Sequence, residues 1–363
     1  MSRAPRPRRQ LSNPLTTVPT AAANARRHHS PRLAARSGLF GIALLVALIA
    51  AVTLSLTIGA RTTTLPTVLA ALTNAGPANG DHAVVLARIP RTITGVLVGA
   101  ALGLAGAGMQ GMTRNPLADP GVLGINAGAS LAVVASIYLL GAQSMSIFIW
   151  FAFAGAALAA VIVYGVASLG REGATPIKLA LAGAALAAGL SSIMIAVLML
   201  SQEALDSFRF WQVGTLGARS LQDIAQVAPY LAVGAVIVLL SSRNLNALSL
   251  GDDAARGLGI SVNRARGIAG IGVVLLCGAA VALAGPIAFV GLVIPHAVRL
   301  VAGSNYARIL PLSVLAGPVL LLTADVVGRV ILPPTEVQVG VMTALIGAPV
   351  FVWLIRSRKK VGL

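Results

Sequence analysis

The chain has 363 residues, of which 57% are hydrophobic and only 10% are charged, and its mean hydropathy is +0.88. A soluble protein of this length could not bury so much apolar surface, so the composition indicates a polytopic membrane protein. The formal net charge is +17, but the excess lies in the tails and in loops beside apolar segments, which disfavours a nucleic-acid partner. The single cysteine, Cys277, excludes a disulfide within the chain.

The first 37 residues are rich in arginine and contain no acidic residue. This composition predicts a disordered, basic cytoplasmic tail over residues 1–37 that can contact anionic lipid. The apolar run that follows is too long for the core of a cleavable signal peptide. We therefore expect one membrane domain over residues 38–357 and a short basic cytoplasmic end over 358–363.

Apolar segments long enough to cross or nearly cross a bilayer recur along the membrane domain. They predict an all-α protein of about ten transmembrane helices, at residues 39–60, 92–111, 121–140, 147–169, 178–200, 224–241, 264–284, 287–302, 309–328 and 338–355. The segment 287–302 is short and contains Pro295, His296 and Arg299, so its depth in the membrane is the hardest to assign.

The distribution of Lys and Arg predicts the orientation, because cytoplasmic loops carry an excess of these residues. With an even number of spans and both termini in the cytoplasm, most of the 27 cationic residues fall on the inner side. Six remain outside: Arg61, Arg88, Arg91, Arg209, Arg219 and Arg329. The expected location is the cytoplasmic membrane, with several crossings.

The second predicted span is marked by small residues at every fourth position, among them Gly95, Gly99 and Gly103. Residues four apart share one helix face, so this face can approach another helix at backbone distance. The apolar run then stops at a Pro- and Gly-rich stretch over 114–121, which predicts a fixed turn before the next span.

Arg88 and Arg91 lie three residues apart at the outer mouth of the second span, and Arg329 ends the ninth. These cations run against the positive-inside bias. They are either anchors that extend to the membrane interface or a basic rim that receives an acidic partner; the rim is the favoured interpretation. Asp325 lies four residues before Arg329 on the same predicted helix, so we expect the two to form an ion pair.

The longest inner loop, residues 245–260, has a pattern typical of a short amphipathic helix. Asp252 or Asp253 can cap such a helix, and Gly257 and Gly259 can end it. The helix would dock into a groove of a cytoplasmic protein or, alternatively, lie on lipid; docking is favoured.

Two further features bear on function. Residues 170–176 form a tight inner turn between the fourth and fifth spans, and Gly285-Pro286 separates two later spans. The sequence lacks the phosphate-binding loop GxxxxGK[ST] and any cluster of spaced metal ligands. We therefore expect no ATP hydrolysis by this chain, no enzymatic activity, no cofactor and no metal site.

Several motifs occur in order between residues 40 and 357 and together resemble the FecCD/BtuC family, the permeases of type II ABC importers for iron-siderophores, haem and vitamin B12. The motifs are RIPR (88–91), MQ (109–110), RNPLADPGVLG (114–124), FWQ (210–212), LSLG (248–251), GPIAFVGLVIPH (285–296) and GAP (347–349). Within the family, the stretches 113–120, 126–130, 209–212 and 325–329 look most like FepD-type subunits for ferric enterobactin.

The resemblance implies a BtuC-like permease of ten helices that pairs with a second permease around a central path, with a heterodimer favoured over a homodimer. It also implies two cytoplasmic ATP-binding subunits and an extracytoplasmic substrate-binding protein that docks on Arg88, Arg91 and Arg329. By the same resemblance, the cytoplasmic gate contains Gly173, Thr175 and Pro176. The loop that couples to the ATPase comprises Leu250, Gly251, Asp252, Asp253, Arg256, Gly257, Leu258 and Gly259.

The function that this implies is import of an iron(III)-siderophore complex through the cytoplasmic membrane. Two alternatives remain open. The same fold could carry haem or vitamin B12, or the chain could be an ion-coupled secondary carrier, although its spans lack the charges that such carriers place at the midplane.

Overall fold

The computed structural model describes residues 31–59, 61–73, 80–142, 144–170, 175–217, 219–333 and 335–358, and the regular elements within these ranges are helical. Seven helices are long and apolar enough to span a membrane: α1 (Pro31–Thr57), α3 (Gly80–Thr113), α5 (Met145–Ala167), α6 (Pro176–Leu200), α8 (Leu221–Leu240), α11 (Val262–Ala284) and α13 (Tyr306–Val330). Three shorter apolar helices are α4 (Ile125–Leu140), α12 (Val290–Ala302) and α14 (Val339–Arg358). These helices correspond one to one with the predicted segments.

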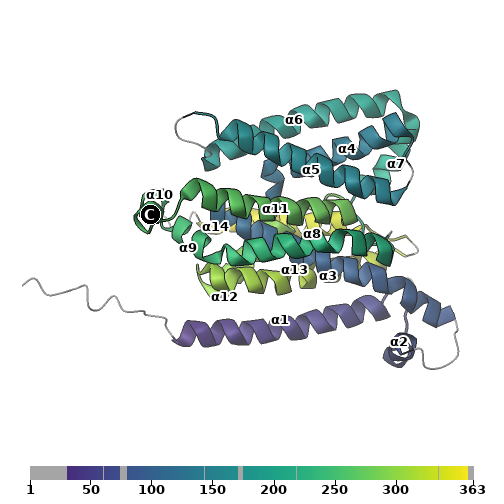
Figure 1. Ribbon diagram of the computed structural model, residues 1–363. Helices are drawn as coiled ribbons and strands as arrows, with labels where there is room; N and C mark the ends of the chain where they lie inside the picture. Colours follow the sequence, from purple (N-terminus) through teal and green to yellow (C-terminus); the bar gives the residue numbers. More distant parts are fainter. Residues whose placement is uncertain are drawn as a thin grey trace, which may run out of the picture.

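Short helices gather at the two ends of the bundle (Figure 1). The end with α2 (Leu65–Leu72) and α7 (Gln202–Gln212) is called the outer end. The opposite end, called the inner end, carries α9 (Ser242–Ser249) and α10 (Asp252–Gly257). A 3-10 helix, η2 (Pro120–Leu123), connects the inner end of α3 to α4.

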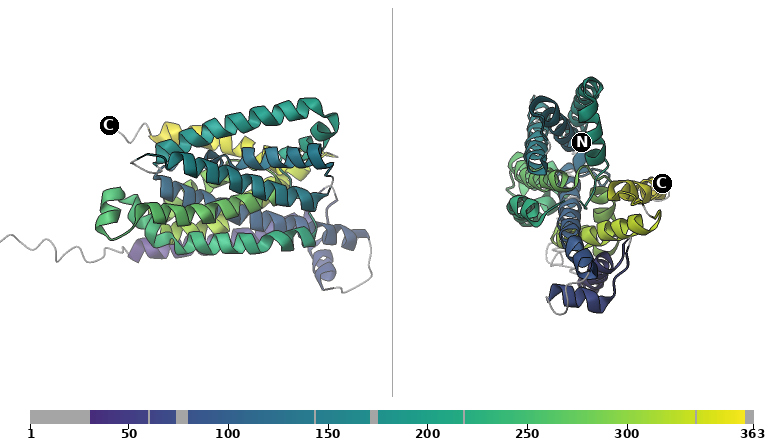
Figure 2. Two further views of the ribbon diagram at one scale, coloured as in Figure 1. Left: turned by 45° about the horizontal axis from the view of Figure 1, so that its top comes forward. Right: turned by 90° about the vertical axis from the view of Figure 1, so that its right-hand side faces the viewer.

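Helix α3 runs through the middle of the bundle, as the end-on view in Figure 2 shows. It packs against α13, α11 and α12, and 78% of its most apolar window is buried. Its 34 residues correspond to ~51 Å, well beyond the ~30 Å of a hydrocarbon core. The span was predicted to begin at residue 92; the helix begins at Gly80 and continues through Pro90, so Arg88 and Arg91 are helical residues near its outer end.

The glycine face of α3 lies against α13. A Cβ atom built on Gly99 would be 2.6 Å from the Cα of Pro318, and one on Gly103 would be 2.6 Å from the carbonyl oxygen of Ser313. At Gly95 the nearest neighbour is the side chain of Leu322. At Gly99 and Gly103 the opposing atoms belong to backbone, which cannot yield as a side chain can, so larger residues there would push the two helices apart.

The turn after α3 is held by side chains that replace backbone partners. Asn115 Oδ1 accepts a hydrogen bond from the backbone N–H of Leu117 (3.0 Å), and Asp119 Oδ1 accepts one from that of Gly121 (2.8 Å). Such Asx turns fix a short loop without regular structure. Gly124, with φ of 69°, then turns the chain into α4, so this helix starts four residues later than the predicted span.

The ends of the chain differ in part from the prediction. α1 begins at Pro31, inside the tail that was expected to be disordered through residue 37. Residues 1–30 and 359–363 lie outside the described ranges.

Candidate functional site

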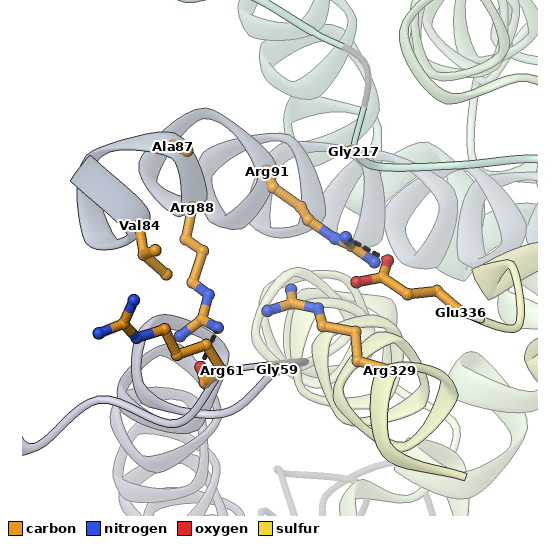
Figure 3. Close-up of a pocket in the computed structure, with 9 residues that line it drawn as sticks. All are labelled: Gly59, Arg61, Val84, Ala87, Arg88, Arg91, Gly217, Arg329 and Glu336. Atoms are coloured by element: carbon orange, nitrogen blue, oxygen red, sulfur yellow. Dashed lines mark hydrogen bonds and ion pairs between the residues drawn. The ribbon is translucent and has the colours of Figure 1, made fainter. Parts of the chain in front are cut away.

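Three arginines converge at the outer end from two neighbouring helices. Arg88 and Arg91 come from α3 and Arg329 from α13, and all three line a cavity of about 310 Å³ together with Arg61 and Glu336 (Figure 3). Four cationic side chains and one carboxylate in so small a space form an anion-attracting site.

Asp325 is the buried carboxylate that holds two of these arginines. It accepts hydrogen bonds from Arg91 Nη2 (2.8 Å) and from Arg329 Nε (2.9 Å), and its side chain is 1% exposed. The predicted pairing of Asp325 with Arg329 is confirmed. The additional bond to Arg91 crosses from α13 to α3, so the ion pair also joins the two central helices.

Arg88 is held in a different way. Its guanidinium donates to the backbone carbonyls of Leu56 (2.9 Å) and Thr57 (3.1 Å) at the end of α1, and to that of Arg61. Among the residues that the structure describes, none of the carboxylates forms a salt bridge with it. Arg88 is therefore held mainly by carbonyl oxygens, with no carboxylate bonded to it among the described residues.

The arginines of the predicted basic rim differ in how deeply they are buried. Arg88 is 9% exposed and Arg329 only 3%, because each is tied to backbone at the end of α1. The site is a recessed cavity whose charges are partly neutralised from within. Arg61, whose side chain is 65% exposed, is the lining cation most accessible from outside.

Glu336 is the member of this site that sequence reasoning missed. Its carboxylate accepts a hydrogen bond from Arg91 Nη1 at 2.7 Å and is 36% exposed. It lies in the loop between α13 and α14, 245 residues from Arg91. The sequence alone offered no signal for it, because five other acidic residues (Asp81, Glu203, Asp206, Asp223 and Asp325) also lie in elements at the outer end.

The predicted coupling loop contains one short helix at the inner end, α10, and follows directly on α9. Gly251, with φ of 111°, occupies the N-cap of α10, so neither Asp252 nor Asp253 is the cap as expected; both lie in the first turn. The helix ends at Gly257, as predicted, and Gly259 follows with φ of 79°.

The residues of α10 divide into an inward and an outward set. Asp252 points inward and pairs with Arg266 (2.8 Å) and Arg114 (3.2 Å). Asp253 pairs with Arg256 (2.8 Å) at the surface, where both are exposed. Leu250 and Leu258, on either side of α10, are also exposed. The outward set combines charge with apolar surface, as docking surfaces do.

The predicted gate is described only in part. Gly173 lies outside the described residues. Thr175 is the N-cap of α6, and its hydroxyl accepts a hydrogen bond from the backbone N–H of Lys178 (3.4 Å); Pro176 is the first residue of the helix. This arrangement fixes the inner start of α6.

Comparison with known proteins decides the family. The model of the FecCD transport family matches residues 18–357. This chain belongs to the FecCD transport family. It is a multi-pass membrane protein, and permeases of this family are not themselves catalytic.

Two relatives illustrate the similarity within the FecCD family. The chain is 46% identical to the ferric enterobactin transport system permease FepD of Escherichia coli (strain K12), over 88% of this chain and 95% of FepD. It is 43% identical to the probable siderophore transport system permease YfiZ of Bacillus subtilis (strain 168), over 88% of this chain and 96% of YfiZ.

The fold is also that of a solved ABC transporter chain. A metal-chelate type ABC transporter in an inward-facing conformation superposes with a TM-score of 0.76 and 27% identity, covering 87% of this chain and 98% of the other.

Proposed function

We propose that this FecCD-family chain is the permease subunit of an ABC importer that carries an iron(III)-siderophore complex through the cytoplasmic membrane. The support from relatives is that both FepD and YfiZ are named for siderophore transport. The structure supports the proposal with two candidate docking surfaces at opposite ends of the helix bundle. They are the arginine cavity at the outer end and the exposed face of α10 at the inner end.

The single observation that carries the proposal is the arginine cavity at the outer end. A recessed site lined by Arg61, Arg88, Arg91 and Arg329 selects a partner that can insert a carboxylate. An extracytoplasmic substrate-binding protein with acidic side chains at its docking edge is such a partner. The burial of Arg88 and Arg329 favours this role over that of lipid anchors, which extend to the membrane interface.

The inner surface supplies the complementary half of the mechanism. Two ATP-binding subunits in the cytoplasm, outside this chain, would press on the outward set of α10. Asp252 links α10 to Arg266 on α11 and to Arg114 at the end of α3, so a push on α10 reaches the central helix directly. Motion of α3 against α13 would then alter access to a path shared with a second permease, in a heterodimer rather than a homodimer. Both termini would lie in the cytoplasm.

Docking at the outer cavity is tested with Arg88→Gln. This change removes a cation that has no carboxylate partner among the described residues, so it leaves no buried charge unpaired and the fold should survive. We expect the assembled transporter to lose most of its affinity for the binding protein, measured by biolayer interferometry. Unchanged affinity in a correctly assembled complex would contradict the docking role.

The identity of the cargo is tested in cells from which the gene for this chain has been deleted, with and without a restored copy of that gene. Uptake of radiolabelled iron as catecholate, hydroxamate and citrate chelates is compared with uptake of haem and cobalamin. We expect at least one iron(III) chelate to depend on the chain and on ATP. The proposal would be overturned if only the uptake of haem or cobalamin required this chain. It would also be overturned if a proton uncoupler stopped uptake while ATP was still present.

A further inference from the structure

A second cavity, of about 490 Å³, lies toward the inner end between α5, α6 and α11, of which α5 and α11 run side by side (Figure 1). Its walls are mainly aliphatic and include Val161, Leu179, Ile271 and Val274. Val161 and Ile271 are 68% and 58% exposed, so the cavity opens on an apolar outer face of the bundle. In a membrane protein such a face meets lipid.

Three glycines leave this cavity empty rather than closing it. A Cβ atom on Gly165 would meet nothing within 4 Å; on Gly267 the nearest atom would be Tyr164 Oη at 3.6 Å, and on Gly270 Met112 Sδ at 3.9 Å. These positions therefore differ from Gly99, where backbone crowds the site. Helix packing does not require glycine here, and the absence of side chains creates the space.

Two cations, Arg264 and Lys178, lie close in the sequence to residues that line the cavity near its inner end. Arg264 lies one helical turn before Gly267 and two turns before Ile271, so it shares the helix face that lines the cavity; its side chain is exposed. Lys178 is adjacent to the lining residue Leu179, and its Nζ donates to the carbonyl of Leu169 (3.4 Å). Two cations close to an apolar cavity near the inner end complement an anionic headgroup above an acyl chain.

The floor of the cavity is connected to the coupling helix. Arg266 lines the cavity with a side chain that is only 5% exposed. It donates to the carbonyl oxygen of Met112 (3.2 Å) at the end of α3 and to Asp252 of α10 (2.8 Å). An occupant that packs against Arg266 therefore touches the same ion pair that joins α10 to the central helix.

We propose that this cavity binds one anionic phospholipid of the cytoplasmic leaflet, with an acyl chain in the cavity and the phosphate on Arg264 and Lys178. The volume falls in the ~300–1,000 Å³ range of small-molecule sites. A partner helix, ~10–12 Å across, is too wide to enter, whereas an acyl chain is not. The lipid fills the space left by the three glycines and supports Arg266 from the membrane side.

The test is native mass spectrometry of the full-length chain, released from detergent and titrated separately with phosphatidylglycerol and phosphatidylethanolamine. We expect one bound phosphatidylglycerol with a preference of about 25-fold, since each of the two cations near an anionic headgroup contributes about fivefold. Arg264→Gln should reduce that preference by about fivefold. Arg243→Gln, at another exposed inner cation, is the matched control and should leave it unchanged.

Filling the cavity gives an independent arm of the test. Gly270→Leu should abolish binding of both lipids, and Val161→Trp, from the opposite wall, should do the same if the first variant fails to fold. Gly38→Leu, at a position of α1 with nothing within 4 Å, is the control. Lipid retention that is unaffected by both filling variants, an equal preference for the two lipids, or equal effects of Arg264→Gln and Arg243→Gln would each overturn the proposal.

Discussion

Arg91 on α3 and Asp325 on α13 are bonded at 2.8 Å across 234 residues of sequence, and Asp325 is at the same time bonded to Arg329. One buried carboxylate thus compensates two arginines from two helices. The outer site depends on this carboxylate, because without it three arginines would face one another with Glu336 as their nearest compensating charge.

Asp325→Asn should therefore destabilise the outer end strongly. Removing one member of a buried ion pair costs about 3–5 kcal/mol of unfolding free energy, because the remaining charge is left uncompensated. Asp206→Asn removes an exposed partner of Arg209 and should cost about 0.2–1 kcal/mol. Thermal unfolding in detergent compares the two. Equal melting temperatures would show that Asp325 does not hold the arginines in place.

Glu336→Gln should strengthen docking of the binding protein. Glu336 occupies Arg91 from within the chain, so a carboxylate from a partner must compete with it. An ion pair as exposed as this one is worth about 0.2–1 kcal/mol, which predicts a dissociation constant up to about fivefold lower. Asp206→Asn is again the control. Weaker docking of Glu336→Gln would mean that Glu336 itself contributes to the interface.

Gly99→Leu should prevent correct assembly. The leucine side chain would overlap the backbone of Pro318 and Gly317 and force α3 away from α13. That separation would also break the bond between Arg91 and Asp325. Gly38→Leu adds the same side chain at an open position of α1. The two variants are compared by their size-exclusion profiles and by the yield of protein from membranes. A monodisperse Gly99→Leu protein at normal yield would argue against close packing of the two helices.

Charge reversal on α10 should separate coupling from folding. The double change Asp253→Lys with Arg256→Glu alters only the exposed pair and should abolish stimulated ATPase activity or release the ATP-binding subunits. The same reversal of Asp206 and Arg209, an equally spaced exposed pair at the outer end, is the matched control. Wild-type coupling in the α10 variant would contradict its role. Asp252→Lys is not a suitable test, because it would break internal pairs with Arg266 and Arg114.

The sequence was sufficient to predict the helices, because ten apolar segments of nearly bilayer length leave little choice of structure. It also predicted the pairing of Asp325 with Arg329, since four residues is one helical turn. The contacts of Arg91 could not be predicted in this way. Its partners Asp325 and Glu336 are distant in sequence, and only the packing of α3 on α13 brings them near.

The solvent exposure of individual charged side chains could not be predicted from the sequence either. The distribution of Lys and Arg placed Arg88, Arg329 and Arg209 together on the outer side. In the structure the first two are buried against the end of α1 and the third is exposed. Likewise, Asp252 and Asp253 are neighbours with opposite roles, because a one-residue step on a helix turns a side chain by about 100°. Both distinctions require knowledge of which elements surround the residue.

We expect this permease to move cargo only when partners act on its two ends. The direct measurement is uptake of a radiolabelled ferric siderophore into proteoliposomes that contain the chain with its second permease, with and without the ATP-binding subunits, the binding protein and ATP. Accumulation against a gradient is expected only when all of these are present. Accumulation by the permeases alone, driven by a proton or sodium gradient, would contradict this expectation.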